Sequence, residues 1–168
     1  QLGFKETYSS ASQNGVMLWD NVNGYPVVSK NGEWVQVVLE DGKYSGAVTT
    51  DQTAASTNTA YALTYTSSTA DGIANGTPAS RIVFDEAGQY MISFSAQIAS
   101  TSSSTVNFWF WPRVNGSDVT GSTMKNALHQ NGAVLVVSRS AIFEINAGDY
   151  LEAMWAVDST NGFLDATA

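Results

Sequence analysis

Seven Asn-Gly pairs divide the 168-residue chain into short segments, and this spacing constrains the fold more than any other feature. Asn-Gly is the preferred dipeptide of two-residue β-hairpin turns, because both turn positions need positive φ angles. The segments between the pairs are rich in β-branched and aromatic residues, and none has a convincing apolar period of 3.6 residues. The sequence therefore predicts an all-β protein. The pairs lie at 14–15, 23–24, 31–32, 75–76, 115–116, 131–132 and 161–162.

The predicted strands follow from these turn signals and from alternating apolar residues. Two predicted hairpins, 84–90 and 145–150, share the pattern of an apolar strand end, Ala-Gly, one polar residue and Tyr. Such a shared pattern suggests equivalent corners of a two-sheet antiparallel sandwich. The predicted strands are 16–19, 25–29, 33–39, 47–50, 60–66, 81–84, 89–98, 106–114, 133–145 and 149–157, with a last short one near Phe163.

The segment 106–111 carries bulky aromatic side chains on both faces of its strand. Alternation sends Phe108 and Phe110 to one face and Trp109 and Trp111 to the other. A strand in an antiparallel sandwich usually has one polar face. Leaving an indole in water forgoes at most about 4–6 kcal/mol, so we expect a second surface to cover the tryptophans. That surface is a loop of the same chain or an identical neighbour, and we favour the neighbour.

Residues 1–50 differ from the rest of the chain, because three Asn-Gly pairs and only short strands lie there. We interpret 1–50 as an N-terminal β-hairpin arm or subdomain and 51–168 as the main sandwich, with a polar connector at 49–59. The alternative is that residues 1–50 complete the sandwich themselves.

Charge and composition exclude several function classes. The formal net charge is −8 and the few Lys and Arg residues are scattered, which argues against binding of nucleic acid or an anionic membrane surface. The chain has no cysteine, so it has no disulfide and no thiolate metal site. No apolar run approaches the roughly 18 residues of a membrane span.

Candidate catalytic residues are few. His129 is the single histidine, and no Gly-x-Ser-x-Gly motif surrounds a serine, so a solvated loop histidine is favoured over a triad. Glu144 and Glu152 could face each other across the 145–150 turn, but interface carboxylates are the preferred interpretation. Asp149, Asp158 and Asp165 could approach one another, with a spacing too general to indicate calcium. We expect no enzyme activity, no metal and no cofactor.

Arg113 follows Pro112 on the same strand face as Trp109 and Trp111. An arginine among apolar neighbours usually pairs with a carboxylate or stacks on an aromatic ring. At a subunit interface, Arg113 and Arg139 could pair with Glu144 or Glu152 of a neighbour. An ordinary surface arginine is the equally weighted alternative.

Three groups of segments follow one another in a specific order and spacing: residues 80–84 with 87–97, residues 113–119 with Ser122, and residues 147–152. Through these segments, the chain from about residue 50 onward resembles small jelly-roll domains of tailed-bacteriophage virion proteins. These domains are similar to the trimeric heads of the tumour necrosis factor and complement-head superfamily.

The resemblance implies a ten-strand jelly-roll sandwich that trimerises, with one sheet of each subunit facing the three-fold axis. It places Met91, Trp109 and Trp111 at or near that axis, together with Leu135 or Val137, and Arg113 lies on the tryptophan face. The implied function is that of a homotrimeric capsid decoration (cement) protein that binds the major capsid protein on the virion surface. Trp19, Tyr25 and Trp34 are the candidate capsid-attachment residues. The alternative is a receptor- or carbohydrate-binding knob at the tip of a fibre, although the chain has no heptads and no shaft repeats.

Overall fold

The structure is a computed structural model that describes residues 3–5, 17–20, 22–36 and 42–166. The described residues form β-strands, turns and loops without any helix, so the all-β prediction is confirmed. The Asn-Gly pair at 14–15, residue 16 and the predicted strand end at 37–39 lie outside the described residues. The chain divides into two compact units, Gln1–Glu40 and Asp41–Ala168.

The first unit is a small four-stranded sheet in the order β1-β2-β3-β4. The pair β1–β2 is parallel, and the other two pairs are antiparallel. Asn31 and Gly32 have φ angles of 52° and 86° and form the two-residue turn between β3 and β4, as the Asn-Gly pair predicts. The strands are β1 (Gly3–Lys5), β2 (Met17–Asp20), β3 (Tyr25–Lys30) and β4 (Glu33–Gln36).

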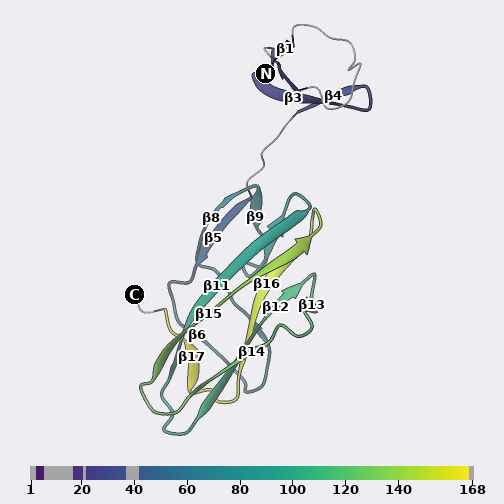
Figure 1. Ribbon diagram of the computed structural model, residues 1–168. Coiled ribbons are helices and arrows are strands. Elements are labelled where there is room, and N and C mark those ends of the chain that lie inside the picture. Colours follow the sequence, from purple (N-terminus) through teal and green to yellow (C-terminus); the bar gives the residue numbers. More distant parts are fainter. Residues whose placement is uncertain (1–2, 6–16, 21, 37–41, 167–168) are drawn as a thin grey trace. The chain divides into compact units, whose positions relative to one another are not determined.

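The second unit contains two larger antiparallel sheets and one strand pair (Figure 1). The seven-stranded sheet has the order β13-β12-β16-β10-β9, with β14 also paired to β12 and β7 also paired to β16. Its strands are β7 (Tyr61–Ala62), β9 (Ile73–Asn75), β10 (Ile82–Phe84), β12 (Val106–Val114), β13 (Ser117–Asp118), β14 (Met124–Leu128) and β16 (Tyr150–Val157).

The other large sheet has the order β15-β11-β17-β6. Its strands are β6 (Gln52–Thr53), β11 (Gly88–Ser100), β15 (Val134–Ile145) and β17 (Gly162–Leu164). The strand pair joins β5 (Lys43–Ala47) to β8 (Ser67–Asp71). Because β5 pairs with β8, it belongs to the second unit, although the sequence suggested a division near residue 50.

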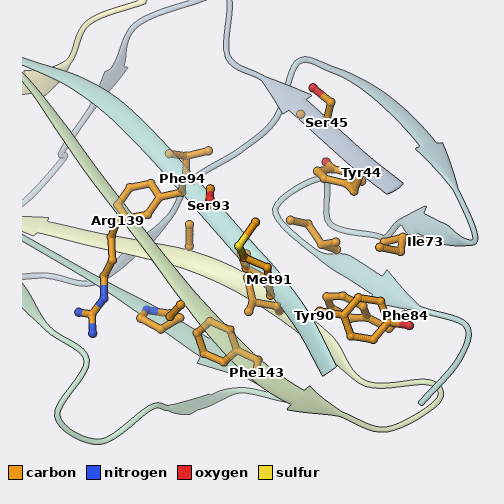
Figure 2. A pocket seen from close by; sticks show the side chains of 18 of the residues that line it. Tyr44, Ser45, Ile73, Phe84, Tyr90, Met91, Ser93, Phe94, Arg139 and Phe143 are labelled. Atoms are coloured by element: carbon orange, nitrogen blue, oxygen red, sulfur yellow. The ribbon is translucent and has the colours of Figure 1, made fainter. Parts of the chain in front are cut away.

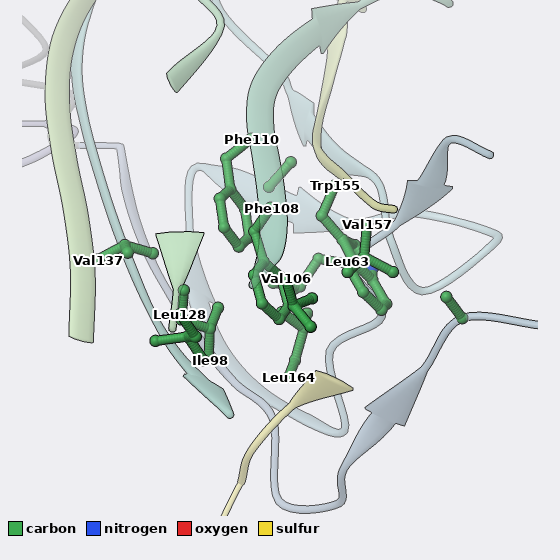
Figure 3. Packing of buried hydrophobic residues seen from close by; sticks show 12 residues of the cluster. Leu63, Ile98, Val106, Phe108, Phe110, Leu128, Val137, Trp155, Val157 and Leu164 are labelled. Carbon is green, nitrogen blue, oxygen red and sulfur yellow. The ribbon is translucent and has the colours of Figure 1, made fainter. Parts of the chain in front are cut away.

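The hydrophobic core lies between the two large sheets (Figure 3). Phe108 and Phe110 of β12 are almost fully buried, as their alternation predicts, and they pack with Val137 of β15. The rings of Phe94 and Phe110 come from opposite sheets, and their centroids are 5.7 Å apart. A second, smaller cluster contains Phe84 and four aliphatic residues: Ile73, Ile82, Ile145 and Leu151.

The two segments with the shared Ala-Gly pattern each cross from one sheet to the other. The turn after Phe84 joins β10 to β11, and the turn after Ile145 joins β15 to β16. The two crossings are hydrogen-bonded: Phe84 N donates to Asp149 O at 2.9 Å, and Gly148 N donates to Phe84 O at 2.7 Å. They are therefore equivalent corners, and neither is a hairpin within one sheet.

Candidate functional site

The pair β11–β15 presents a surface whose charge is low and whose apolar side chains are exposed. Met91 is 78% exposed and lies directly opposite Ile142, which is 70% exposed. Val136, further along β15, is 63% exposed. We call this surface the β11–β15 outer face and define it by Gln89, Met91, Ser93, Ser95, Val136, Ser138, Ser140, Ile142 and Glu144.

The centre of the β11–β15 outer face is a ladder of hydroxyl groups. The hydroxyls of Ser93 and Ser140 are hydrogen-bonded at 2.7 Å. Beyond Met91, Gln89 Nε2 donates to Glu144 Oε1 at 3.3 Å, and Glu144 is the one charged residue of this face. Depletion of charge around exposed apolar side chains is typical of the centre of a protein interface.

The structure places the six predicted trimer residues on more than one surface. Met91 lies on the β11–β15 outer face, whereas Trp109, Trp111 and Arg113 lie on the outer face of the seven-stranded sheet. Leu135 and Val137 are on the inward face of β15: Val137 is buried in the core, and Leu135 is exposed near the strand end.

The two tryptophans are half-buried by side chains of their own chain. Trp109 lies opposite Ala156 on one side and Lys125 on the other, and Lys125 Nζ lies 5.4 Å from the centroid of its ring. Trp111 lies opposite Met154. A shallow depression of about 330 Å³ remains over this tryptophan face, lined by Asn58, Trp109, Trp111, Asp118, Thr123 and Ala156.

Ion pairs border the tryptophan face. Arg113 Nε donates to Asp118 Oδ1 at 2.7 Å, and this hydrogen bond holds the pKa of Asp118 below its ordinary value. Glu152, opposite Arg113 in register, is buried; it accepts a 2.6 Å hydrogen bond from Ser80 Oγ. Arg81 Nε lies 3.8 Å from the same carboxylate oxygen, so this buried charge is compensated.

The structure separates Glu144 and Glu152, the two carboxylates that the sequence analysis considered as a catalytic pair and interpreted as interface residues. Glu144 lies on the outer face of the sheet β15-β11-β17-β6, and Glu152 lies on the outer face of the seven-stranded sheet. They do not face each other, because the 145–150 turn between them crosses from one sheet to the other. His129 is exposed, and its Nδ1 lies 3.2 Å from Thr105 Oγ1.

The three candidate calcium ligands, Asp149, Asp158 and Asp165, each accept hydrogen bonds from different partners. Asp149 and Asp158 flank opposite ends of β16, and Asp165 accepts a hydrogen bond from Gln97 Nε2 at 2.8 Å. Asn107 donates to both carboxylate oxygens of Asp158. Within the described ranges, no three acidic, histidine or cysteine residues are close enough together to hold a metal ion.

The first unit has one face of exposed apolar residues. Met17, Val28 and Val35 lie in one row across three strands, with Trp19 beside them opposite Pro26. We call this row the N-terminal apolar face; its Met17, Trp19 and Val35 are exposed. Of the predicted attachment residues, only Trp19 lies there. Tyr25 and Trp34 lie on the opposite face of the small sheet, which also carries the buried Val27 and Ser29.

Comparison with known proteins identifies no family. No protein-family model matches the chain, and no curated protein is significantly similar to it. Within the part of the chain that the structure describes, no helix has the length and apolarity needed to cross a membrane.

Proposed function

We propose that this protein is a virion structural protein: a homotrimeric jelly-roll protein that decorates and stabilises a phage capsid. The observation that carries the proposal is the β11–β15 outer face, because it leaves Met91 and Ile142 exposed around a nearly uncharged centre. Burying this face against two further copies would remove apolar area from water without desolvating many charges. The sequence resemblance to trimeric virion domains supplies the biological context.

The N-terminal unit has the role of attachment in this proposal. Its exposed Met17, Trp19 and Val35 offer an apolar patch for a coat subunit. Three such units in one trimer would bind three coat subunits at once, so individually weak contacts add through effective concentration. Trimers attached across the seams of the capsid would resist internal pressure.

The proposal is tested first by the mass in solution, measured by light scattering at micromolar concentration. We expect about three times 17.9 kDa. A monomeric mass at micromolar concentration would contradict the proposal.

Capsid binding is then tested by cosedimentation of undecorated capsids with the full chain and with a variant lacking residues 1–40. This truncation keeps β5, whereas removal of residues 1–50 would also remove the partner of β8. We expect the truncated protein to remain a trimer and to lose binding. A truncated trimer that still decorates capsids would remove the N-terminal unit from the mechanism.

The second candidate function is a carbohydrate-binding knob, which the tryptophan face favours. Indole faces stack on the apolar faces of sugar rings, and Asn58, Asp118 and Thr123 line the same depression with hydrogen-bonding groups. A glycan array distinguishes the two functions: specific binding that is lost in Trp111→Ala would favour the knob, and a negative array would favour decoration.

A further inference from the structure

A cavity of about 470 Å³ lies between the sheets of the second unit, next to β5 (Figure 2). Tyr90, Ile92 and Phe94 of β11 line it on one side, and Phe84 and Phe110 of the seven-stranded sheet line it on the other. In β11, all six consecutive residues from 90 to 95 line the cavity, and at β5 the five consecutive residues from 42 to 46 line it. Consecutive residues point alternately to both faces of a strand, so the edges of β11 and β5 themselves border the cavity.

The edge of β11 at this cavity has no strand partner in the described part of the chain. β15 pairs with β11 from Gly88 to Ala99, but on the other edge β17 pairs only with Ile98, Ala99 and Ser100. The last hydrogen bond on this edge runs from Asp165 N to Gln97 O. Likewise, β8 pairs with one edge of β5, and no described strand pairs with the other edge.

The hydrogen bonds at one end of β11 show which backbone groups face the open edge. Ser100 N donates to Ala133 O, and Ser100 O accepts from Gly132 N, so the backbone N–H and C=O groups of Ser100 face the β15 side. Gln97 O points the other way, toward Asp165. Because successive residues of an antiparallel strand alternate, the N–H and C=O groups of Gln89, Met91, Ser93 and Ser95 face the open edge. Those of Tyr90, Ile92 and Phe94 face β15.

The spacing of these groups selects the chemistry of an occupant. Residues two apart in a strand repeat every ~6.8 Å, and each offers one donor and one acceptor. An extended polypeptide supplies the complementary groups at the same repeat, as in strand addition to a sheet edge. Every second side chain of such a segment would point into the cavity among aromatic rings, so apolar side chains fit there.

Charge further restricts the occupant. Among the described residues that line the cavity, the charged ones are Lys43 and Arg139, and none is acidic. A neutral or acidic segment therefore fits better than a basic one. A second copy of this chain could offer only a strand that stays attached to its own sheet, and the space between the β11 edge and β5 fits a single segment better than the edge of a whole sheet.

We propose that the open edge of β11 binds an extended, non-basic segment of a partner protein, which adds an antiparallel strand to the sheet in line with β17. The open edge exists within a single chain, so this binding does not require the trimer or a capsid.

The test uses the full chain and measures amide hydrogen exchange residue by residue. In the free protein, we expect the amides of Met91, Ser93 and Ser95 to exchange fast and those of Ile92 and Phe94 to exchange slowly. The probe is a blocked peptide of about nine residues in which valine and threonine alternate, at up to ~1 mM. It should slow the three fast amides by at least about tenfold, while the two slow amides stay unchanged.

Two controls separate strand addition from other binding. The same peptide with every backbone nitrogen methylated keeps the side chains but lacks donors, and it should have no effect. In the protein, Ser93→Pro removes one edge N–H that does not face β15 and should weaken peptide binding by about fivefold or more. Ser93→Ala is the matched control, because it loses the same hydroxyl contact with Ser140 but keeps the N–H.

Three results would overturn the proposal. Slow exchange of Met91, Ser93 and Ser95 in the free protein would mean that another copy of the chain already covers the edge. An unchanged exchange pattern at the highest peptide concentration would mean that the edge accepts no strand. Equal protection by the methylated peptide would mean that the cavity binds apolar side chains without strand pairing. If Ser93→Pro does not fold, the exchange pattern of the wild-type protein still decides.

Discussion

Replacing both Met91 and Ile142 by serine tests the β11–β15 outer face as an assembly surface. The two side chains are direct cross-strand neighbours and are 78% and 70% exposed in the single chain. Their removal therefore costs the folded monomer little, and any large effect must come from contacts between chains.

The expected magnitude follows from these exposed fractions. Full burial of a Met or Ile side chain contributes about 1.5–3 kcal/mol, so burial of the exposed parts of Met91 and Ile142 contributes about 2–4 kcal/mol per chain. At 1.4 kcal/mol per factor of ten, the loss corresponds to roughly 30- to 1,000-fold weaker association per chain. A trimer of the wild-type chain should accordingly dissociate in the double variant at micromolar concentration.

Sedimentation velocity over a dilution series measures the association, and urea denaturation measures the stability of the dissociated chain. The matched control is Met17→Ser, because Met17 is an exposed methionine on the other unit and should leave the mass unchanged. A double variant that keeps the wild-type mass across the series would refute the assignment of this face. A variant that dissociates only because it unfolds would also fail to support it, and the denaturation curve reveals that case.

Three further substitutions test the internal structure. Gly162→Ala should destabilise the second unit to urea by about 1–3 kcal/mol, because a Cβ there would lie 2.7 Å from both Phe108 Cζ and Val157 Cγ2. Burial raises the pKa of Tyr65 to about 12, so the folded state keeps the phenol neutral at a pH where the unfolded chain ionises it. The free energy of unfolding should therefore fall by about 2–3 kcal/mol as pH rises from 10 to 12. Tyr65→Phe should remove this loss, as measured by denaturation at a series of pH values. Buried Asp20 Oδ1 accepts hydrogen bonds from two backbone amides of the β2–β3 turn, so Asp20→Ala should speed amide exchange in β2 and β3 by roughly 10- to 100-fold, and unchanged exchange would contradict this role.

The sequence predicted the strands whose apolar residues alternate strongly. Val106–Val114 is predicted with the observed bounds, and the opposite directions of Phe108 and Trp109 follow from alternation alone. Polar strands gave no such signal: Ser67–Asp71 is exposed along its whole length, and Met124–Leu128 contains Lys125 and Asn126. These strands are held by pairing with β5 and β12, which is a tertiary contribution that local propensity does not contain.

The outer-face residues were harder to predict, because both faces of β15 carry apolar side chains. Val136 and Ile142 alternate with Val137 and Phe143, so the sequence does not show which set is buried. The register with β11 decides it: Val137 lies opposite Ala96 on the inward face, and Ile142 lies opposite Met91 on the outward face. The alternation of apolar residues within a single strand contains no information on how that strand pairs with its neighbour.

The structure also changes where an uncovered surface must be sought. The two-faced strand β12 suggested that Trp109 and Trp111 need a neighbouring subunit, but flanking side chains already half-bury both indoles. The ammonium of Lys125 lies over the ring of Trp109, 5.4 Å from its centroid, and a cation over an indole contributes about 0.5–1 kcal/mol at an exposed site. Met91 and Ile142, by contrast, remain 78% and 70% exposed. The hydrophobic gain still available to assembly is therefore larger per side chain on the β11–β15 outer face than on the tryptophan face, and this difference is why the former is the assembly surface we propose.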